Sequence, residues 1–217
     1  MIILIPCKSL SAGKSRLSRC LDGPHRRTLC GFFLKRMIEL ATTVAGAGHV
    51  RVVTSDPAAV TLAGRQGISF FPDAGDGLNA ALETARNRLL AAGLLQGRLT
   101  ILPIDLPYAT ADAVAEAGRS DADVIINSDE RGRGTNLLIL SASAGRIPFS
   151  FGADSFSAHT NTARKLGFEP HIVHDWRVAH DIDDPDQYLA WTQSAAFPHH
   201  LLTADGTEPL GGTTAPL

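Results

Sequence analysis

The feature that most constrains the fold is an alternation of short apolar runs with longer helical patterns over most of the 217 residues. Brief apolar runs bounded by turn residues indicate buried strands, and apolar residues three and four positions apart indicate amphipathic helices. The predicted strands cover residues 2–5, 50–54, 68–71, 99–102, 123–127 and 137–140, and the predicted helices cover 28–44, 58–65, 78–92 and 111–118. This alternation predicts an α/β fold with a mainly parallel sheet covered on both faces.

Length and composition favour one soluble domain. The chain is 44% hydrophobic and 19% charged, with a formal net charge of -2, which excludes a basic nucleic-acid-binding arm and a disordered acidic tail. No apolar run approaches the ~18 residues of a membrane span, and the apolar start lacks the basic residues of a signal peptide. We therefore expect a cytoplasmic protein with a folded domain over residues 1–192 and a flexible tail over 193–217, and no nucleic-acid or membrane partner.

The cysteines and histidines form no recognisable metal or redox motif. Cys7, Cys20 and Cys30 have no C-x-x-C spacing, so buried, reduced thiols are expected. The histidines within residues 171–180 match no common zinc-binding pattern.

A basic loop follows the first predicted strand, at the sheet edge where ligands of such folds bind. Lys8, Lys14 and Arg16 place three cations within nine residues. Gly13-Lys14-Ser15 is like the end of a P-loop, but Lys8 replaces the first glycine of that motif, which excludes it. Basic side chains beside the backbone N–H groups of a helix N-terminus suit a phosphate. A solvated basic loop is the alternative.

Two further loops carry groups suited to a nucleotide and a cation. Gly77, Leu78 and Asn79 precede a predicted helix; glycine allows close approach to a ligand, and an asparagine amide both donates and accepts, as a purine edge requires. Asp105 follows a predicted strand, at the edge where a hard cation bridging substrate phosphates is usually held. A turn with a helix cap is the alternative for each loop.

Segments 129–136 and 151–159 offer hydroxyl, amide and backbone donors that suit a carboxylate or a phosphate ester. Ordinary loop chemistry is the alternative, with Ser155 as the N-cap of a helix that extends to Gly167.

Three acidic side chains, Asp181, Asp183 and Asp184, lie within four residues. They repel one another unless a cation or a helix N-terminus compensates. We expect Asp183 or Asp184 to cap a helix that begins near Pro185, while another of the three binds metal.

Together these motifs resemble the phospholactate guanylyltransferase family, which acts in the assembly of the deazaflavin coenzyme F-420. The resemblance extends in order over residues 2–190. The matching residues are Pro6 with Lys8, Lys14-Ser15-Arg16-Leu17, Gly77-Leu78-Asn79, Asp105-Leu106-Pro107, Gly134-Thr135-Asn136, segment 151–159 and segment 181–185.

The resemblance implies a three-layer α/β/α sandwich of the nucleotide-diphospho-sugar transferase (GT-A-like) type. It implies an enzyme that joins GMP from GTP to a small phosphorylated three-carbon acid and releases pyrophosphate, with Mg²⁺ as cofactor. The acid could be 2-phospholactate, phosphoenolpyruvate or 3-phosphoglycerate, which no motif separates. GTP and the acid are then the partners, and a homodimer is one candidate for the oligomeric state.

The resemblance also implies roles for individual residues. The expected assignments are Lys8, Lys14 and Arg16 to the triphosphate; Gly77, Leu78 and Asn79 to the guanine end; Thr135, Gly152 and Ser155 to the acid; and Asp105 and Asp183 to Mg²⁺, with Asp181 as an alternative ligand. Lys14, Arg16 and Asp105 would be catalytic. A substrate phosphate is already ionised near pH 7, so this reaction needs positioning and electrostatics rather than a general base.

Two other functions are weighed against this one. A nucleotidyltransferase of the same fold that acts on molybdopterin or a sugar phosphate is disfavoured, because such relatives usually have a Gly-rich loop where this chain has residues 8–12. A non-catalytic nucleotide-binding module is disfavoured because Asp105 and Asp183 are both present.

Overall fold

The computed structural model describes residues 1–73 and 75–202. A seven-stranded sheet forms its centre in the order β3-β2-β1-β4-β6-β5-β7. Its strands are β1 (Ile2–Pro6), β2 (Val50–Val53), β3 (Ser69–Phe71), β4 (Leu99–Ile101), β5 (Val124–Ser128), β6 (Thr135–Leu140) and β7 (His171–Val173). β6 runs antiparallel to β4 and β5, while the other neighbouring pairs are parallel. The predicted, mainly parallel sheet is confirmed.

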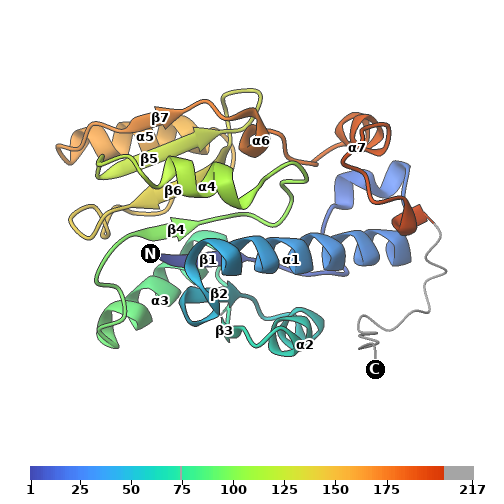
Figure 1. Cartoon of the computed structure of the whole chain (residues 1–217), viewed down its shortest axis with the longest axis horizontal. Coiled ribbons are helices and arrows are strands. Elements are labelled where there is room, and N and C mark those ends of the chain that lie inside the picture. The colour runs from blue at the N-terminus through green and yellow to red at the C-terminus, as the bar shows by residue number, and fades with distance from the viewer. Residues whose placement is uncertain (74, 203–217) are drawn as a thin grey trace.

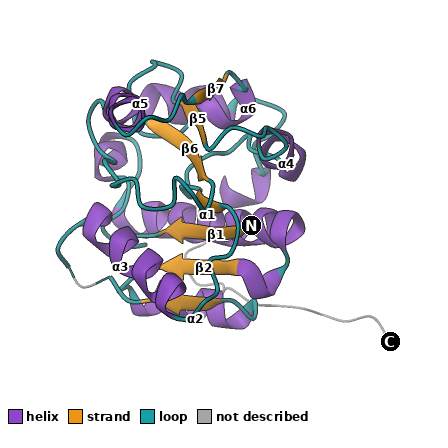
Figure 2. Cartoon of the chain, turned by 90° about the vertical axis from the view of Figure 1, so that its left-hand side faces the viewer, coloured by secondary structure: helices purple, strands orange, loops and turns teal. Residues whose placement is uncertain are grey.

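Helices cover both faces of this sheet (Figures 1 and 2). One face packs against α1 (Gly23–Ala45), α2 (Pro57–Arg65), α4 (Ala111–Ala117) and α6 (Trp176–Ala179). The other face packs against α3 (Leu78–Ala91) and α5 (Ser155–Lys165). The expected three-layer α/β/α sandwich is therefore confirmed. In the described part of the chain, no helix is long and apolar enough to cross a membrane.

The central strand β1 shows why these residues form a sheet buried on both sides. Ile3 and Ile5 lie in the core cluster beneath α1, whereas Ile2 and Leu4 lie in the cluster beneath α3. Side chains alternate between the two faces of a strand, so a run of four apolar residues supplies both layers at once. Pro6 ends the run, and the chain leaves the sheet at its carboxyl edge.

A third core cluster joins the start of α1 to the last residues that the structure describes. It includes Phe33 of α1, Trp191 of α7 (Pro185–Thr192) and Phe197. The rings of Trp191 and Phe197 meet edge to face at 4.8 Å. Within the predicted tail over residues 193–217, Phe197 is buried and the 3₁₀ helix η3 (His199–Leu202) follows it. The remaining predicted tail, residues 203–217, lies outside the described residues.

Local signals explain other differences from the predicted elements. α1 begins five residues earlier than expected, because the Asp22 carboxylate accepts a hydrogen bond from the His25 backbone N–H. β7 and α6 are too short to produce a periodic pattern and were not predicted. Cys7 and Cys30 are buried as expected, but Cys20 is exposed.

Candidate active site

The predicted site segments meet at the carboxyl edge of the sheet. The chain leaves β1 and enters the 3₁₀ helix η1 (Ser15–Arg19), and Asp105 follows β4. Because β6 is antiparallel, with Leu138 opposite Ile101, its first residue Thr135 lies at this same edge. A single antiparallel strand thus places its start beside the ends of the parallel ones.

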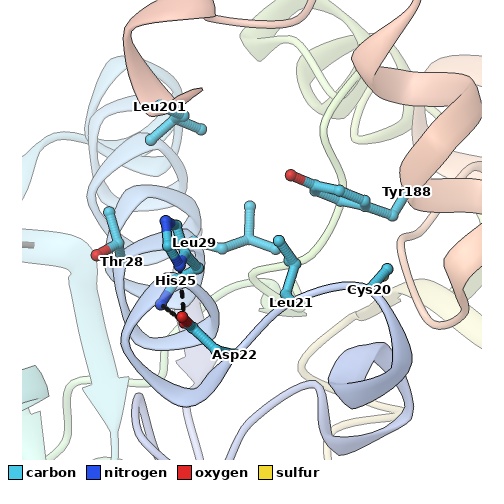
Figure 3. A pocket seen from close by; sticks show the side chains of 8 residues that line it. All are labelled: Cys20, Leu21, Asp22, His25, Thr28, Leu29, Tyr188 and Leu201. Atoms are coloured by element: carbon cyan, nitrogen blue, oxygen red, sulfur yellow. Dashed lines mark hydrogen bonds and ion pairs between the residues drawn. The ribbon is translucent and has the colours of Figure 1, made fainter. Parts of the chain in front are cut away.

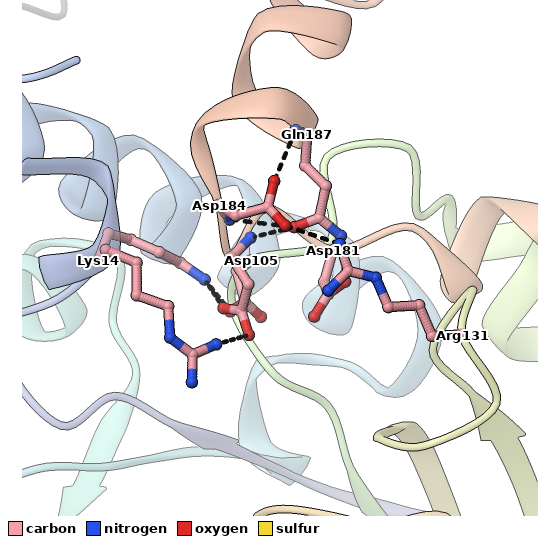
Figure 4. Close-up of polar contacts among 8 residues, drawn as sticks. Lys14, Asp105, Arg131, Asp181, Asp184 and Gln187 are labelled. Atoms are coloured by element: carbon pink, nitrogen blue, oxygen red, sulfur yellow. Dashed lines mark hydrogen bonds and ion pairs between the residues drawn. The ribbon is translucent and has the colours of Figure 1, made fainter. Parts of the chain in front are cut away.

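Lys14 is the centre of a charged cluster at this edge (Figure 4). Its ammonium group donates to Asp105 and, at 2.8 Å, to Asp183 Oδ1, although these residues are far apart in the sequence. The Lys14 side chain is only 9% exposed. Burial lowers the pKa of Lys14, but the Asp105 and Asp183 carboxylates outweigh it, and the net result is a raised pKa. Lys14 is therefore held as a cation between two carboxylates.

The loop that carries Lys14 is tightly packed. A Cβ added to Gly13 would lie 2.7 Å from the Ser9 carbonyl oxygen and 2.8 Å from Cys30 Sγ, so glycine is needed for this close approach. Lys14 itself has φ 53°, in the left-handed region. The loop is also tied to α2, since the Asp56 carboxylate accepts from Leu10 N at 2.8 Å.

The other two predicted basic residues are more exposed. Arg16 reaches Asp183 Oδ2 at 3.5 Å with a side chain that is 75% exposed. Lys8 is exposed on the preceding loop. The structure thus brings Lys14 and Arg16 to the carboxylates, and leaves Lys8 outside this set of contacts.

Asp181 completes the acidic side of the cluster. Burial, followed by the nearby carboxylates of Asp105 and Asp183, raises the pKa of Asp181 to about 6. Gln187 Nε2 donates to Asp181 Oδ1 at 3.3 Å. Asp181 therefore lies close to the carboxylates of Asp105 and Asp183, with Lys14 as the buried cation near all three.

Asp184 has a structural role, as the capping alternative predicted. It is the N-cap of α7 and accepts from the backbone N–H of Gln187 at 3.0 Å within a capping box. It also accepts from Arg131 at 2.7 Å. Because these partners occupy its carboxylate, Asp183 is left as the member of this pair that faces the charged cluster.

Carboxylate oxygens are the ligands that a hard cation prefers, so the chemistry of this donor set fits Mg²⁺. Within residues 1–73 and 75–202, no group of three or more His, Cys, Asp or Glu side chains is arranged to hold a metal ion. Mg²⁺ is commonly bound by one or two carboxylates together with substrate phosphates. The pair Asp105 and Asp183 matches that pattern.

The predicted acid-binding residues lie next to this edge, around a network of neutral hydrogen bonds; Thr135 and Ser155 are buried, whereas Gly152 is exposed. Thr135 Oγ1 is 3.0 Å from Nδ1 of His159, and the Ser150 backbone N–H donates to Nε2 of the same ring at 2.9 Å. Gly152 has φ +134°, a conformation that L side chains rarely adopt. Segment 150–152 is thereby held in one shape beside Thr135.

Ser155 is not the helix N-cap that the alternative interpretation of this segment gave it. The cap position of α5 belongs to Asp154, whose φ is 55° and whose side chain makes no capping bond. Ser155 is the first helical residue and is 2% exposed, and its N–H donates to the Gly152 carbonyl at 3.2 Å. The serine therefore packs against the glycine turn.

One face of α3 fixes the loop that leads to Gly152. The Asn79 amide accepts from Phe151 N at 2.8 Å and donates to Phe151 O at 3.0 Å. Glu83 accepts from Phe149 N at 3.1 Å, and Arg86 donates to Ile147 O at 2.6 Å. These three side chains are four and three residues apart, the spacing of neighbours on a helix surface.

Both halves of the Asn79 amide are thus used by protein backbone. The predicted role of Gly77, Leu78 and Asn79 at the guanine end stays a prediction. Glu83, Arg86 and His159 were missed as site-building residues. The sequence signal for the first two is their helical spacing from Asn79, and for His159 it is the final position of segment 151–159.

A cavity of about 340 Å³ lies elsewhere, between the start of α1 and α7 (Figure 3). Its lining includes His25, Leu29 and Tyr188, and none of its lining residues belongs to the predicted site.

Comparison with known proteins shows the family of this chain. The family described as "Guanylyl transferase CofC like" matches residues 1–191. A phosphoenolpyruvate guanylyltransferase of Rubrobacter xylanophilus is 37% identical over 84% of this chain and 89% of its own length. A 2-phospho-L-lactate guanylyltransferase of Archaeoglobus fulgidus is 29% identical over 87% of this chain and 82% of its own length.

A solved structure supports the fold independently of sequence similarity. It is classed as a nucleotide-diphospho-sugar transferase of Desulfovibrio desulfuricans, with a TM-score of 0.69 at 15% identity, and it covers 93% of both chains. The family match spans almost all of the described residues. The chain therefore belongs to the CofC-like guanylyltransferase family.

Proposed function

We propose that this guanylyltransferase joins GMP from GTP to a small phosphorylated three-carbon acid, with release of pyrophosphate, in coenzyme F-420 biosynthesis. Phosphoenolpyruvate and 2-phospho-L-lactate are the acids named for its relatives, and 3-phosphoglycerate has the same size and charge. The observation that carries this proposal is the buried Lys14 between Asp105 and Asp183, beside the network of Thr135 and segment 150–152.

The two regions suit the two substrates. Lys14 and Arg16 offer positive charge to the triphosphate, while Thr135, Gly152 and Ser155 offer neutral donors to the acid. An oxygen of the acid's phosphate attacks the α-phosphorus of GTP, a new P–O–P linkage forms, and the bond to the β-phosphate breaks. The cations then stabilise the charge that develops on the leaving pyrophosphate.

Asp105 and Asp183 would hold Mg²⁺, and both lie close enough to Asp181 to raise its pKa. When bound, the cation neutralises phosphate charge and helps to align the reacting groups. The protein's own contribution is to hold Lys14 in its strained loop, which keeps a permanently charged ammonium group next to Asp105 and Asp183.

Incubation of the protein with Mg²⁺, each of the four nucleoside triphosphates and each of the three acids tests this proposal, with pyrophosphate release as the readout. We expect release that requires GTP, Mg²⁺ and one of the acids. Acid-independent release, or none with GTP, would contradict the proposal. A second arm with a sugar phosphate as acceptor distinguishes a related nucleotidyltransferase. Light scattering tests whether the protein is a homodimer, the candidate oligomeric state.

A further inference from the structure

His159 is a buried residue of α5 whose two ring nitrogens are both engaged. The side chain is 1% exposed. Nε2 lies 2.9 Å from the Ser150 backbone nitrogen, and Nδ1 lies 3.0 Å from Thr135 Oγ1. The ring also meets the Phe151 ring edge to face at 4.8 Å. One imidazole therefore contacts both Thr135 and the segment 150–152 that contains Gly152.

The positions of the protons follow from these partners. A backbone N–H can only donate, so Nε2 of His159 must accept from Ser150 and carries no proton. Burial lowers the pKa of His159 to about 4, so the ring is neutral near pH 7. A neutral imidazole has one N–H, and it is therefore on Nδ1. His159 thus donates to the oxygen of Thr135.

This fixes the direction of the Thr135 hydroxyl. Its oxygen already accepts from His159, so its own proton is left to donate to another group. Among the described residues, Thr135 Oγ1 has no second protein partner. An anionic oxygen of a phosphate or carboxylate is the acceptor that such a hydroxyl binds most strongly.

We propose that His159 is a positioning residue for the phosphorylated acid. It presets Thr135 as a hydrogen-bond donor and, through Ser150, anchors the turn that contains Phe151 and Gly152. Asn79 holds the same turn through both backbone groups of Phe151. This inference rests on the proposed function, in which Thr135, Gly152 and Ser155 receive the acid.

The test is a double-substitution cycle of Thr135→Val and His159→Phe, with the KM for the acid and the KM for GTP measured in each variant. Thr135→Val removes the donor, so we expect the acid KM to rise about ten- to a hundredfold. His159→Phe keeps an aromatic ring against Phe151 but leaves Thr135 without its donor, and we expect a rise of about tenfold. The GTP KM should change by less than about twofold in both variants, because neither side chain contacts the charged cluster.

The combined variant decides the question. If His159 acts through Thr135, adding His159→Phe to Thr135→Val raises the acid KM by less than about threefold, because the hydroxyl it would orient is already gone. Independent, multiplicative effects would overturn the inference that His159 acts through Thr135, and would leave only its contact with Ser150 and its packing as its role. Unchanged acid KM in His159→Phe alone would also overturn it.

Two further variants protect the test against simple unfolding. Thr160→Val is the matched control, since it removes a neighbouring buried hydroxyl of α5 that has no hydrogen-bond partner among the described residues. We expect wild-type kinetics from it.

His159→Gln keeps an acceptor for the Ser150 backbone N–H but has no second donor in the place of the His159 Nδ1–H. It should therefore raise the acid KM even if His159→Phe fails to fold. If the wild-type protein transfers GMP to none of the acids, the proposed function fails; if it does and the cycle is multiplicative, only the role of His159 fails.

Discussion

The charged cluster around Lys14 and the neutral network around His159 lie at the same sheet edge, but they are built differently. In the cluster, Lys14 pairs with Asp105 and Asp183, which are 91 and 169 residues away along the chain. In the network, His159 bonds to Thr135 and Ser150, only 24 and 9 residues away. The first depends on the whole fold, and the second on one strand, one turn and one helix.

The two regions also differ in what they contribute to stability. Asp183 is 46% exposed and Asp105 22% exposed, so water screens the carboxylate side of the cluster, although their partner Lys14 is only 9% exposed. Loss of either carboxylate alone still leaves Lys14 with one partner of opposite charge. The network is buried and consists of neutral hydrogen bonds, whose loss leaves unpaired groups in the core. We therefore expect substitutions in the cluster to change activity alone, and substitutions in the network to change stability as well.

Asp105→Asn gives the largest expected effect. It removes one charge of the predicted metal pair and one partner of Lys14, and we expect turnover to fall by about a hundred- to a thousandfold. The folding free energy should change by less than about 1 kcal/mol, because Asp183 still pairs with the buried Lys14 and the loss of one charge relieves the repulsion of Asp181 by its neighbours. Steady-state kinetics and urea unfolding measure the two quantities.

Asp121→Asn is the matched control, because it makes the same chemical change at an exposed position. It should leave both turnover and stability unchanged. Turnover of Asp105→Asn close to that of the control would remove Asp105 from the active site. A large loss of stability would instead contradict the contrast between the two regions.

The network should respond to pH through His159. Its pKa is about 4 in the folded protein against 6.5 in the unfolded chain, so the unfolded state binds its proton first as pH falls. The stabilisation is complete above pH 6.5 and decreases between pH 6.5 and 4, by about 3 kcal/mol in all. Urea unfolding of the wild type and His159→Phe across this range measures it, because other titrating groups cancel in the difference. If the unfolding free energies of the two proteins changed with pH in the same way, His159 would not titrate as expected.

Local pattern was sufficient to predict the layers and the order of most elements. Apolar runs such as the one in β1 carry their own signal, and a helix such as α3 is readable from its composition. The structural role of Asn79 was not readable in this way, because its partner Phe151 is 72 residues away. An asparagine before a helix has the same appearance in the sequence whether it binds a base or a backbone.

The acidic segment shows a similar limit. Asp183 and Asp184 are neighbours with the same side chain, and the sequence predicted that one of them caps a helix and another binds metal. Gln187, three residues after Asp184, completes the capping box, and this spacing is the signal that favours Asp184 as the cap. The link between Asp183 and Lys14 depends on sheet order and could not be read locally.

Asn79→Ala tests whether the two hydrogen bonds between the Asn79 side chain and the Phe151 backbone, here called the clamp, stabilise the fold. It leaves a backbone N–H and a carbonyl of Phe151 without their partners, so we expect a loss of about 2 kcal/mol in unfolding free energy. Asn87→Ala, at an exposed position of the same helix, is the matched control and should lose less than about 0.5 kcal/mol. Equal stability of the two variants would contradict the clamp. A rise in the GTP KM of Asn79→Ala without loss of stability would instead support the predicted contact of Asn79 with the guanine base.

Asp184→Ala gives the smallest expected effect and separates two adjacent carboxylates. It removes the N-cap of α7 and the partner of Arg131, for which we expect a loss of about 1 kcal/mol in unfolding free energy. Turnover should fall less than about threefold, because the Asp184 carboxylate is directed to backbone N–H groups and not to Lys14. Asp183→Ala should show the opposite pattern, with little loss of stability and a large loss of turnover. If Asp184→Ala abolished turnover while Asp183→Ala remained active, the acidic residue of the charged cluster would have to be reassigned, and the separation between structural and charged carboxylates at this edge would not hold.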